Sequence, residues 1–293
     1  PEFYTTAQNY DVDPIIGCEF YLTPSGIQDQ SDSTRYHQVL LAKNQTGYEN
    51  LMQLSSLSFT EGFYYKPRID LDLLREYHEG LIATTCCLQG QVPQLILNRG
   101  EVAAREKFEE YLDIFGDDYY IELQDHDIDD QHTINEVLVE WADEYDVEVL
   151  ATNDVHYVDQ QDHEAQDILL CLQTGDDYND PNRMRFSNDQ FYLKDPEGMM
   201  EALTGIPEEV QREALVNTNK VADKCTFDLP MGDLLMPHYP IPDGFEDMDE
   251  YLRHLTFERA KERYGEPLSQ TVVDRLNHEL GIIADMGYSG YFL

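Results

Sequence analysis

The sequence predicts an α/β fold in which a barrel-like domain is followed by an entirely helical region. Strand and helix patterns alternate up to about residue 157, which is typical of α/β domains. Polar residues follow several of these strands, as they do at the active-site rim of a β/α barrel. Beyond that point the apolar residues have helical spacing only.

The composition is that of a folded chain in a reducing compartment. The 293 residues are 41% apolar, enough for one large or two ordinary domains with a real core. No apolar run approaches the ~20 residues of a membrane span, so we expect no membrane contact. The 5 cysteines show no CxxC spacing, which argues against a zinc ribbon or a disulfide framework. A cytoplasmic location fits them best.

Acidic residues outnumber basic ones along the whole chain. There are 59 Asp and Glu against 19 Lys and Arg, a formal net charge of -40. Taken alone, this charge argues against a nucleic-acid surface, because phosphate binding requires Lys and Arg. The acid is spread over the chain, as in DDYYIELQDHDIDDQ and GFEDMDEY. We interpret it as the solvated shell of a protein from a salt-adapted, halophilic organism.

The first two strands carry the first two candidate ligands. Residues 14–22 form a strand with Glu19 near its end, and residues 36–42 form the next strand, which His37 opens. In a purely parallel barrel these two side chains would lie at opposite ends. No helix fits into the polar loop 23–34 between the strands, so we expect an antiparallel hairpin instead. Glu19 and His37 would then share one rim.

The alternation continues through the centre of the chain. Helices are predicted at 48–59, 71–78, 101–115 and 130–145, and strands at 80–84, 119–123 and 147–151. The strand at 80–84 runs out at Cys86 and Cys87. Cys87 could serve as a soft metal ligand, although cysteine is among the most often buried residue types and a structural role for one of two neighbours is expected.

The stretch VEVLATNDVHY, residues 147–157, holds the strongest pair of candidate metal ligands. A buried strand ends in polar residues, and Asp154 and His156 point to the same side if the extended backbone continues. A carboxylate and an imidazole together suit borderline divalent cations such as Zn²⁺ or Mn²⁺. An Asp-x-His pair by itself is weak evidence, because Asp and Asn often end strands simply to make turns.

The remainder divides into helices and a linker. Helices are predicted at 162–173, 196–203, 207–224, 248–264 and 268–286, with an irregular stretch at 181–192. Residues 228–244 hold four prolines and are expected to be a linker or docking segment. We therefore place one domain at residues 1–230 and a second region, the linker and its following helices, at 231–293. Because the chain opens in what looks like a helix and without Met, we expect it to be part of a longer protein.

Several longer strings give the chain a family resemblance. In order they are IIGCEFYL, HQVLLAKNQTGYENLMQLSS, EGFYYKPRID, GLIATTCCLQGQVPQ, VLATNDVHY, LLCLQTG, LLMPHYPIPDG and MGYSGYFL. Together they resemble the PHP (polymerase and histidinol phosphatase) domain of the bacterial replicative DNA polymerase III alpha subunit, over essentially the whole chain. GFYYKPRID and MGYSGYFL are the most specific, since the small PHP phosphatases are not expected to carry them.

The resemblance implies a distorted seven-stranded β/α barrel with metal ions in its mouth, here without its first strand, followed by helices that lead into the polymerase palm. It implies metal-ligand roles for Glu19, His37, Cys87, Asp154 and His156, of which Asp154 and His156 would also be catalytic. Zn²⁺ or Mn²⁺ would occupy this site and Mg²⁺ the polymerase site of the parent protein. The family's N-terminal His-x-His strand would lie before Pro1, and its polymerase aspartates and nucleotide loop beyond Leu293.

Two classes of function follow, and the sequence leaves both open. The first is a metal-dependent phosphoesterase, a 3′–5′ exonuclease that proofreads for an attached polymerase. The second is a structural module that supports the polymerase and docks a separate proofreading subunit. A free-standing histidinol-phosphatase-like enzyme is disfavoured by the helical tail. Implied partners are DNA, a sliding clamp and a proofreading subunit. We expect the 293-residue chain alone to be inactive.

Overall fold

The computed structural model describes residues 2–232, 236 and 238–293. These residues form two compact units, Pro1–Leu229 and Pro230–Leu293. No helix among the described residues is both long enough and apolar enough to cross a membrane.

Strands and helices alternate through the first unit, as the sequence predicts. Its strands are β1 (Gly17–Leu22), β2 (Tyr36–Ala42), β3 (Arg68–Ile69), β4 (Leu81–Thr84), β5 (Tyr119–Leu123) and β6 (Val149–Ala151). Its helices are α1 (Glu2–Asn9), α2 (Gln45–Thr60), α3 (Leu71–Tyr77), α4 (Gln91–Arg99), α5 (Glu101–Phe115), α6 (Asp129–Tyr145), α7 (His163–Thr174), α8 (Pro196–Ala202) and α9 (Glu208–Lys224).

The strands form one six-stranded sheet in the order β3-β1-β2-β4-β5-β6. Strand β2 runs antiparallel to both of its neighbours, whereas the other pairs are parallel. The α/β class is confirmed. Over the described residues the ladder runs from β3 to β6 without pairing these two strands to each other, so the expected closed barrel is not seen.

The predicted hairpin of β1 and β2 is confirmed. Its register pairs Tyr21 with His37 and Glu19 with Val39. Because β2 alone is reversed, its first residues lie at the same edge as the carboxyl ends of β1 and the other strands. That edge is the expected position of a β/α active site.

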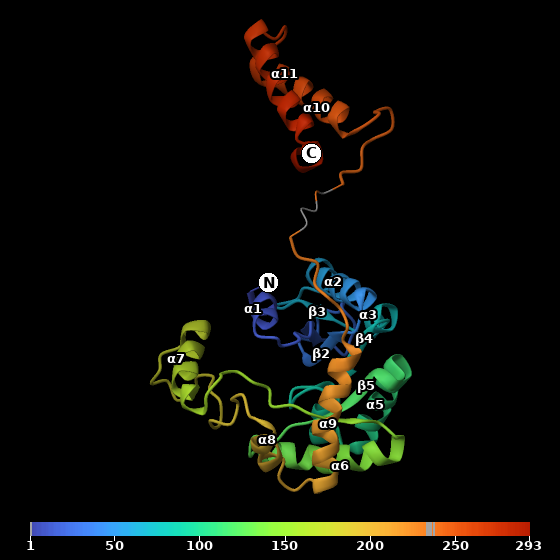
Figure 1. Cartoon of the computed structure of the whole chain (residues 1–293), viewed down its shortest axis with the longest axis vertical. Helices are drawn as coiled ribbons and strands as arrows, with labels where there is room; N and C mark the ends of the chain where they lie inside the picture. Colours follow the sequence, from blue (N-terminus) through green and yellow to red (C-terminus); the bar gives the residue numbers. More distant parts are fainter. Residues whose placement is uncertain (1, 233–235, 237) are drawn as a thin grey trace. The chain divides into compact units, whose positions relative to one another are not determined.

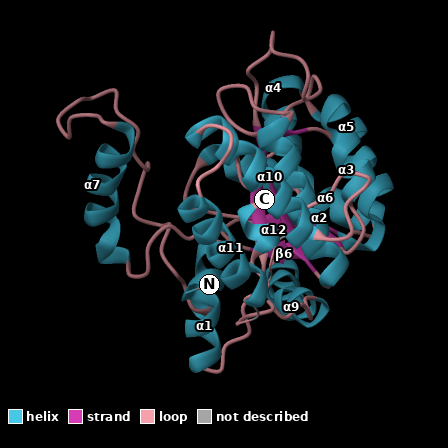
Figure 2. Ribbon diagram, turned by 90° about the horizontal axis from the view of Figure 1, so that it is seen from above, coloured by secondary structure: helices cyan, strands magenta, loops and turns pink. Residues whose placement is uncertain are grey.

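Buried apolar side chains hold the sheet between its helices. Every residue of β4, β5 and β6 is buried, as expected for parallel strands covered on both faces. Figure 2 shows helices surrounding the strands, and α9 lies along β6. Trp141 of α6 and Phe108 of α5 lie at the centre, with ring centroids 5.2 Å apart.

Local signals in the sequence explain where several helices begin. Asn44 caps α2 by accepting a hydrogen bond from the Gly47 amide, and Asp70 caps α3 through the Leu73 amide. Asp195 does the same for α8, which has proline in its first turn. Each of these short side chains satisfies an amide that the first helical turn leaves without a partner.

In the first unit the sequence prediction missed the helix α4 and the strand β3. Helix α4 follows directly after the Cys87–Gln91 turn and carries a proline in its first turn, where proline is tolerated. Strand β3 has only two residues and pairs with β1. Its Arg68 side chain is fully buried and donates to the carbonyl oxygens of Gly62, Ile27, Asp29 and Asp32. A strand this short is specified by that tertiary contact, not by a repeating pattern.

The second unit is a small helical assembly. It contains α10 (Met248–Tyr264), α11 (Gln270–Asp285) and α12 (Ser289–Phe292). Helix α10 contacts both of the others, and Arg253 of α10 donates to Asn277 of α11 over 2.6 Å. Its first two helices agree with the predictions at 248–264 and 268–286, whereas α12 was not predicted. Figure 1 shows the succession of elements along the whole chain.

Candidate metal centre

The hairpin register brings Glu19 and His37 together. Residues at diagonal positions of an antiparallel pair lie on the same face of the sheet. The Glu19 Oε1 atom is 3.2 Å from His37 Nδ1. The position of each side chain is fixed by the ladder, because both residues belong to the paired strands.

Cys87 joins this pair from the end of β4. The backbone turns at Cys86, which has a φ of 66°, a conformation uncommon for residues other than glycine. The turn buries the Cys86 side chain and leaves Cys87 half-buried. The Cys87 Sγ atom then lies 3.5 Å from His37 Nδ1. We call Glu19, His37 and Cys87 the hairpin group.

Asp154 and His156 come together by a different route from the one predicted. The extended backbone does not continue past β6, because Asp154 has a φ of 41°. His156 Nδ1 lies 2.6 Å from the Asp154 carbonyl oxygen and 3.9 Å from its carboxylate. The strand-alternation argument was therefore wrong in its geometry. A tight turn, not alternation, brings the two residues together. We call Asp154 and His156 the loop group.

A distant segment holds the loop group in place. The His156 amide donates to the Phe191 carbonyl over 2.9 Å, and its ring lies 4.7 Å from that of Phe186. Asn153 donates to the carbonyl oxygens of Gln190 and Tyr192. These contacts substitute for the sheet ladder that the loop group lacks.

Electrostatic effects connect the two groups. Burial raises the pKa of Glu19, and the negative charges of Cys87 and Asp154 raise it further, whereas His37 and His156 oppose the shift. The hydrogen bond with Cys87 raises the pKa of His37, with smaller contributions from Glu19 and Asp154. Asp154 thus contributes to the pKa of two members of the hairpin group, and it follows β6, which runs parallel to β5 as β5 does to β4. All five predicted residues lie at one edge of the sheet.

Cys87 has the properties of a metal-binding thiolate. The hydrogen bond from the Cys86 thiol, assisted by His37 and the Gln89 amide, lowers the pKa of Cys87 to about 5 against the effect of burial. The pKa of Cys86 is raised well above its usual value, because it hydrogen-bonds to Cys87 and is buried. Thiolates are the form in which cysteine binds metals. The pKa shifts of the two neighbouring thiols therefore have opposite directions.

The donor set fits a divalent cation chemically, although its arrangement is not closed. Imidazole, thiolate and carboxylate are the ligands that Zn²⁺ takes in proteins. Among the described residues, however, no three His, Cys, Asp or Glu side chains are grouped as a ready-made metal site. The side chains of Glu19 and Asp154 are 48% and 34% exposed, which leaves both carboxylates room to rotate.

Glu122 is a buried carboxylate that the sequence prediction missed. It lies on β5, where it accepts hydrogen bonds from Thr84, Thr152 and Gln124. Burial raises its pKa, and the charges of Cys87 and Asp154 contribute to the same shift. Its hydrogen bonds tie the ends of β4, β5 and β6 together beneath the candidate ligands. The signal in the sequence was one acid inside the apolar strand YYIEL.

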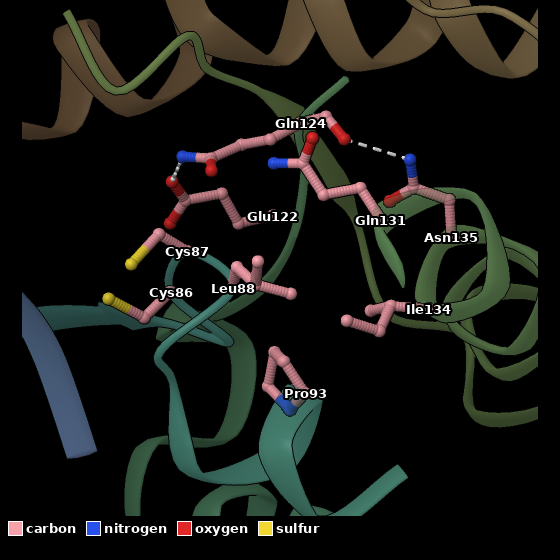
Figure 3. Close-up of a pocket in the computed structure, with 9 residues that line it drawn as sticks. All are labelled: Cys86, Cys87, Leu88, Pro93, Glu122, Gln124, Gln131, Ile134 and Asn135. Carbon is pink, nitrogen blue, oxygen red and sulfur yellow. Dashed lines mark hydrogen bonds between the residues drawn. The ribbon is translucent and has the colours of Figure 1, made fainter. Parts of the chain in front are cut away.

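Figure 3 shows the floor of this region, with Glu122 hydrogen-bonded to Gln124 and the two thiols nearby. The small cavity here has a volume of about 10 Å³ and is also lined by Leu88 and Pro93. That volume is about what one water molecule requires. The floor of this region is therefore tightly packed.

Comparison with family models gives two matches in separate parts of the chain. Residues 1–126 match the PHP domain. Residues 250–293 match the bacterial DNA polymerase III alpha NTPase domain. The first match covers the hairpin group and Glu122, and the second covers the helices of the second unit.

Curated relatives align with the chain from end to end. The DNA polymerase III subunit alpha of Borreliella burgdorferi is 42% identical over 100% of the chain and 25% of its own length. That of Treponema pallidum is 42% identical over 95% of the chain and 24% of its own length. The Thermus aquaticus subunit is 40% identical over 98% of the chain. The chain thus spans about a quarter of the length of these relatives.

Proposed function

Because the chain carries a PHP domain and aligns along its whole length with bacterial DNA polymerase III alpha subunits, we propose that it forms part of a replicative DNA polymerase. On this proposal, residues 231–293 begin the polymerase core, which would itself use Mg²⁺. DNA, a sliding clamp and a proofreading subunit would be its partners.

We further propose that the PHP domain is a metal-dependent phosphoesterase that removes nucleotides from a 3′ end. The observation that supports this is the contact of three different donor types in the hairpin group, with Glu19 and Cys87 both within 3.5 Å of His37 Nδ1. Together with Asp154 and His156 they would hold Zn²⁺ or Mn²⁺. Bound cations would supply Lewis acidity, a nucleophilic hydroxide and charge stabilisation for phosphodiester cleavage.

The hairpin group, the loop group and Glu122 would have different roles in this site. The hairpin group supplies donors at fixed positions, since its members belong to paired strands or a tight turn. The loop group would close the site, and its Asp154 would set the spacing and charge. Glu122 is a positioning residue, because it acts on the strand ends and is too buried to meet a substrate.

The substitution Asp154→Asn in the proposed polymerase subunit provides the test. An amide keeps the shape of the carboxylate but binds hard or borderline cations poorly. Excision of a 3′-mismatched primer should therefore be lost, while primer extension is largely retained. Asp143→Asn, at an exposed position of α6, is the control and should leave both activities unchanged.

The alternative structural module makes the opposite prediction. It expects no excision by the unmodified protein and an effect of Asp154→Asn on thermal stability only. Robust excision by the Asp154→Asn variant would remove the catalytic role proposed for this residue. The subunit must be purified away from other nucleases for either result to count.

A further inference from the structure

A cluster of positive charge lies next to the candidate metal centre, in a chain where such charge is scarce. Arg35, Arg99 and Lys107 line one cavity of about 710 Å³, and Asp32 is its one carboxylate. Cations therefore outnumber acids here by three to one, whereas the whole chain has 59 acidic and 19 basic residues. The cavity is therefore mainly basic, whereas the chain as a whole is acidic.

Two of these cations are available to a ligand. Among the described residues, Arg35 and Arg99 form no ion pair, although most other basic side chains do. Arg35 makes only a long hydrogen bond of 3.4 Å to the Ser33 carbonyl and lies over the Tyr21 ring. Lys107 differs, because it contacts Glu110 over 2.9 Å. Asp32 is already engaged, since it accepts a hydrogen bond from the Thr34 amide.

The cavity and the candidate centre share two structural elements. Tyr36 lines the cavity and His37 belongs to the candidate centre, and consecutive residues of a strand point to opposite faces. Gln89 lines the cavity from the same turn that carries Cys87, and its carbonyl accepts from the His37 amide over 2.9 Å. Arg35 of the cavity lies over the Tyr21 ring, and the Tyr21 ring contacts the His37 ring with centroids 5.6 Å apart. The cavity therefore borders the candidate centre through Arg35.

We propose that this cavity binds the phosphates of single-stranded DNA and guides its 3′ end to the candidate centre. Arginine is suited to this task, because its planar guanidinium binds phosphate oxygens in pairs. The volume exceeds that of one phosphate and lies in the range of sites for larger ligands. Of the side-chain amides on the wall, those of Gln94 and Asn98 already donate to Leu88 and Gln94, whereas that of Gln89 can hydrogen-bond to sugars and bases. The proposal rests on the proposed phosphoesterase function, whose substrate it specifies.

Binding can be measured on the 293-residue chain without any catalysis. The probe is a 5′-labelled oligothymidylate of about ten nucleotides, followed by fluorescence anisotropy in EDTA at rising KCl. Each phosphate contact to a single strand contributes about -0.7 to the slope of log K against log salt. Arg35→Gln and Arg99→Gln should each reduce the slope by about 0.7, and the double variant should approach loss of binding.

Arg212→Gln is the matched control. Arg212 is exposed on α9 and paired with Glu208, so its loss changes the net charge by the same amount as the loss of Arg35. It should leave binding unchanged. Equal effects of Arg212→Gln and Arg35→Gln, or no binding of the oligonucleotide by the unmodified chain at low salt, would overturn the proposal.

Two further measurements distinguish this proposal from the phosphoesterase proposal and from a simple anion site. Asp154→Asn should bind the oligonucleotide normally, so binding without excision would remove only the phosphoesterase proposal. Excision that is insensitive to both arginine substitutions would remove only the cavity proposal. Inorganic phosphate should compete weakly. If phosphate binds with the same dependence on Arg35 and Arg99 while the oligonucleotide does not bind, the cavity is an anion site and not a strand-binding site.

Discussion

The hairpin group and the loop group lie at the same edge of the sheet but are positioned by different physical means. Glu19 and His37 are held by the ladder between β1 and β2, and Cys87 by a tight turn at the end of β4. Asp154 and His156 follow a strand that ends at Ala151 and depend on contacts with residues 186–192. One half of the candidate centre is therefore part of the sheet, and the other half is placed by a loop from elsewhere in the chain.

The difference suggests which half is preorganised and which can adjust. Asp154 has a left-handed backbone at a φ of 41°, a conformation that costs about 1 kcal/mol or more and persists only when surrounding contacts impose it. Such strain is common at functional sites. We expect the hairpin group to keep its geometry without a cation and the loop group to complete the site.

The largest effect on stability is expected from replacing Arg68, whose hydrogen bonds support the hairpin of β1 and β2. Arg68 binds four carbonyl oxygens and so fixes the loop that joins β1 to β2. Arg68→Met would leave the two buried acceptors, the carbonyl oxygens of Gly62 and Ile27, without this donor, at a cost of about 1–3 kcal/mol for each one that water cannot reach. We expect the free energy of unfolding of the first unit to fall by about 3 kcal/mol or more.

Urea denaturation followed by fluorescence of Trp141, the single tryptophan, reports on this unit. Arg212→Met on the exposed surface of α9 is the control and should change the free energy by less than about 0.5 kcal/mol. Similar losses in the free energy of unfolding for Arg68→Met and Arg212→Met would show that the hydrogen bonds of Arg68 do not support the hairpin.

The second effect concerns the reactivity of Cys87. Its pKa of about 5, against an ordinary 9.0, makes it mostly thiolate at pH 6. Lower basicity reduces the nucleophilicity of a thiolate, so the expected gain in alkylation rate over an ordinary thiol is about tenfold at this pH. His37→Ala should raise the pKa and slow the reaction. Iodoacetamide labelling in EDTA, resolved by peptide fragmentation, measures the rate, with Cys18 as the internal comparison.

The same shift has a consequence for stability. The folded pKa is lowered, so the stabilisation from Cys87 is present in full above pH 9.0 and is lost as the pH falls through about 5.

Zn²⁺ should protect Cys87 from alkylation if it is a ligand. Two results together would exclude Cys87 as a metal ligand. These are a labelling rate that saturating Zn²⁺ does not change, and a pH midpoint of labelling near that of an ordinary thiol.

Salt is expected to have the smallest effect and to act mainly on the loop side. The segment after Asp154 is rich in acid, with Asp159, Asp162, Asp176 and Asp177 among its residues. Raising KCl from ~0.1 to ~1 M shortens the screening length from about 10 to 3 Å. The thermal midpoint should rise by a few degrees, and amide exchange should slow more in residues 154–162 than in the hairpin. A flat or falling midpoint would assign the acidic surface another purpose, such as binding a basic partner.

The sequence by itself determined most of the secondary structure and the identity of the candidate ligands. Apolar periodicity is encoded by near neighbours, which is why β2 and β5 were predicted to the residue. The absence of a helix between β1 and β2 was enough to predict an antiparallel pair, and hence the meeting of Glu19 with His37. Residue type and position after a buried strand made Asp154 and His156 metal-binding candidates, and the family resemblance strengthened that interpretation.

Only the tertiary structure decided how these residues are supported. The turn at Asp154, the buried Glu122 and the hydrogen bonds of Arg68 each depend on a partner more than 35 residues away. The cavity of Arg35, Arg99 and Lys107 brings together a loop, a turn and two helices. No local pattern records such distances, because the free energy of each contact depends on burial and on register. Both are set when the sheet and its helices pack together.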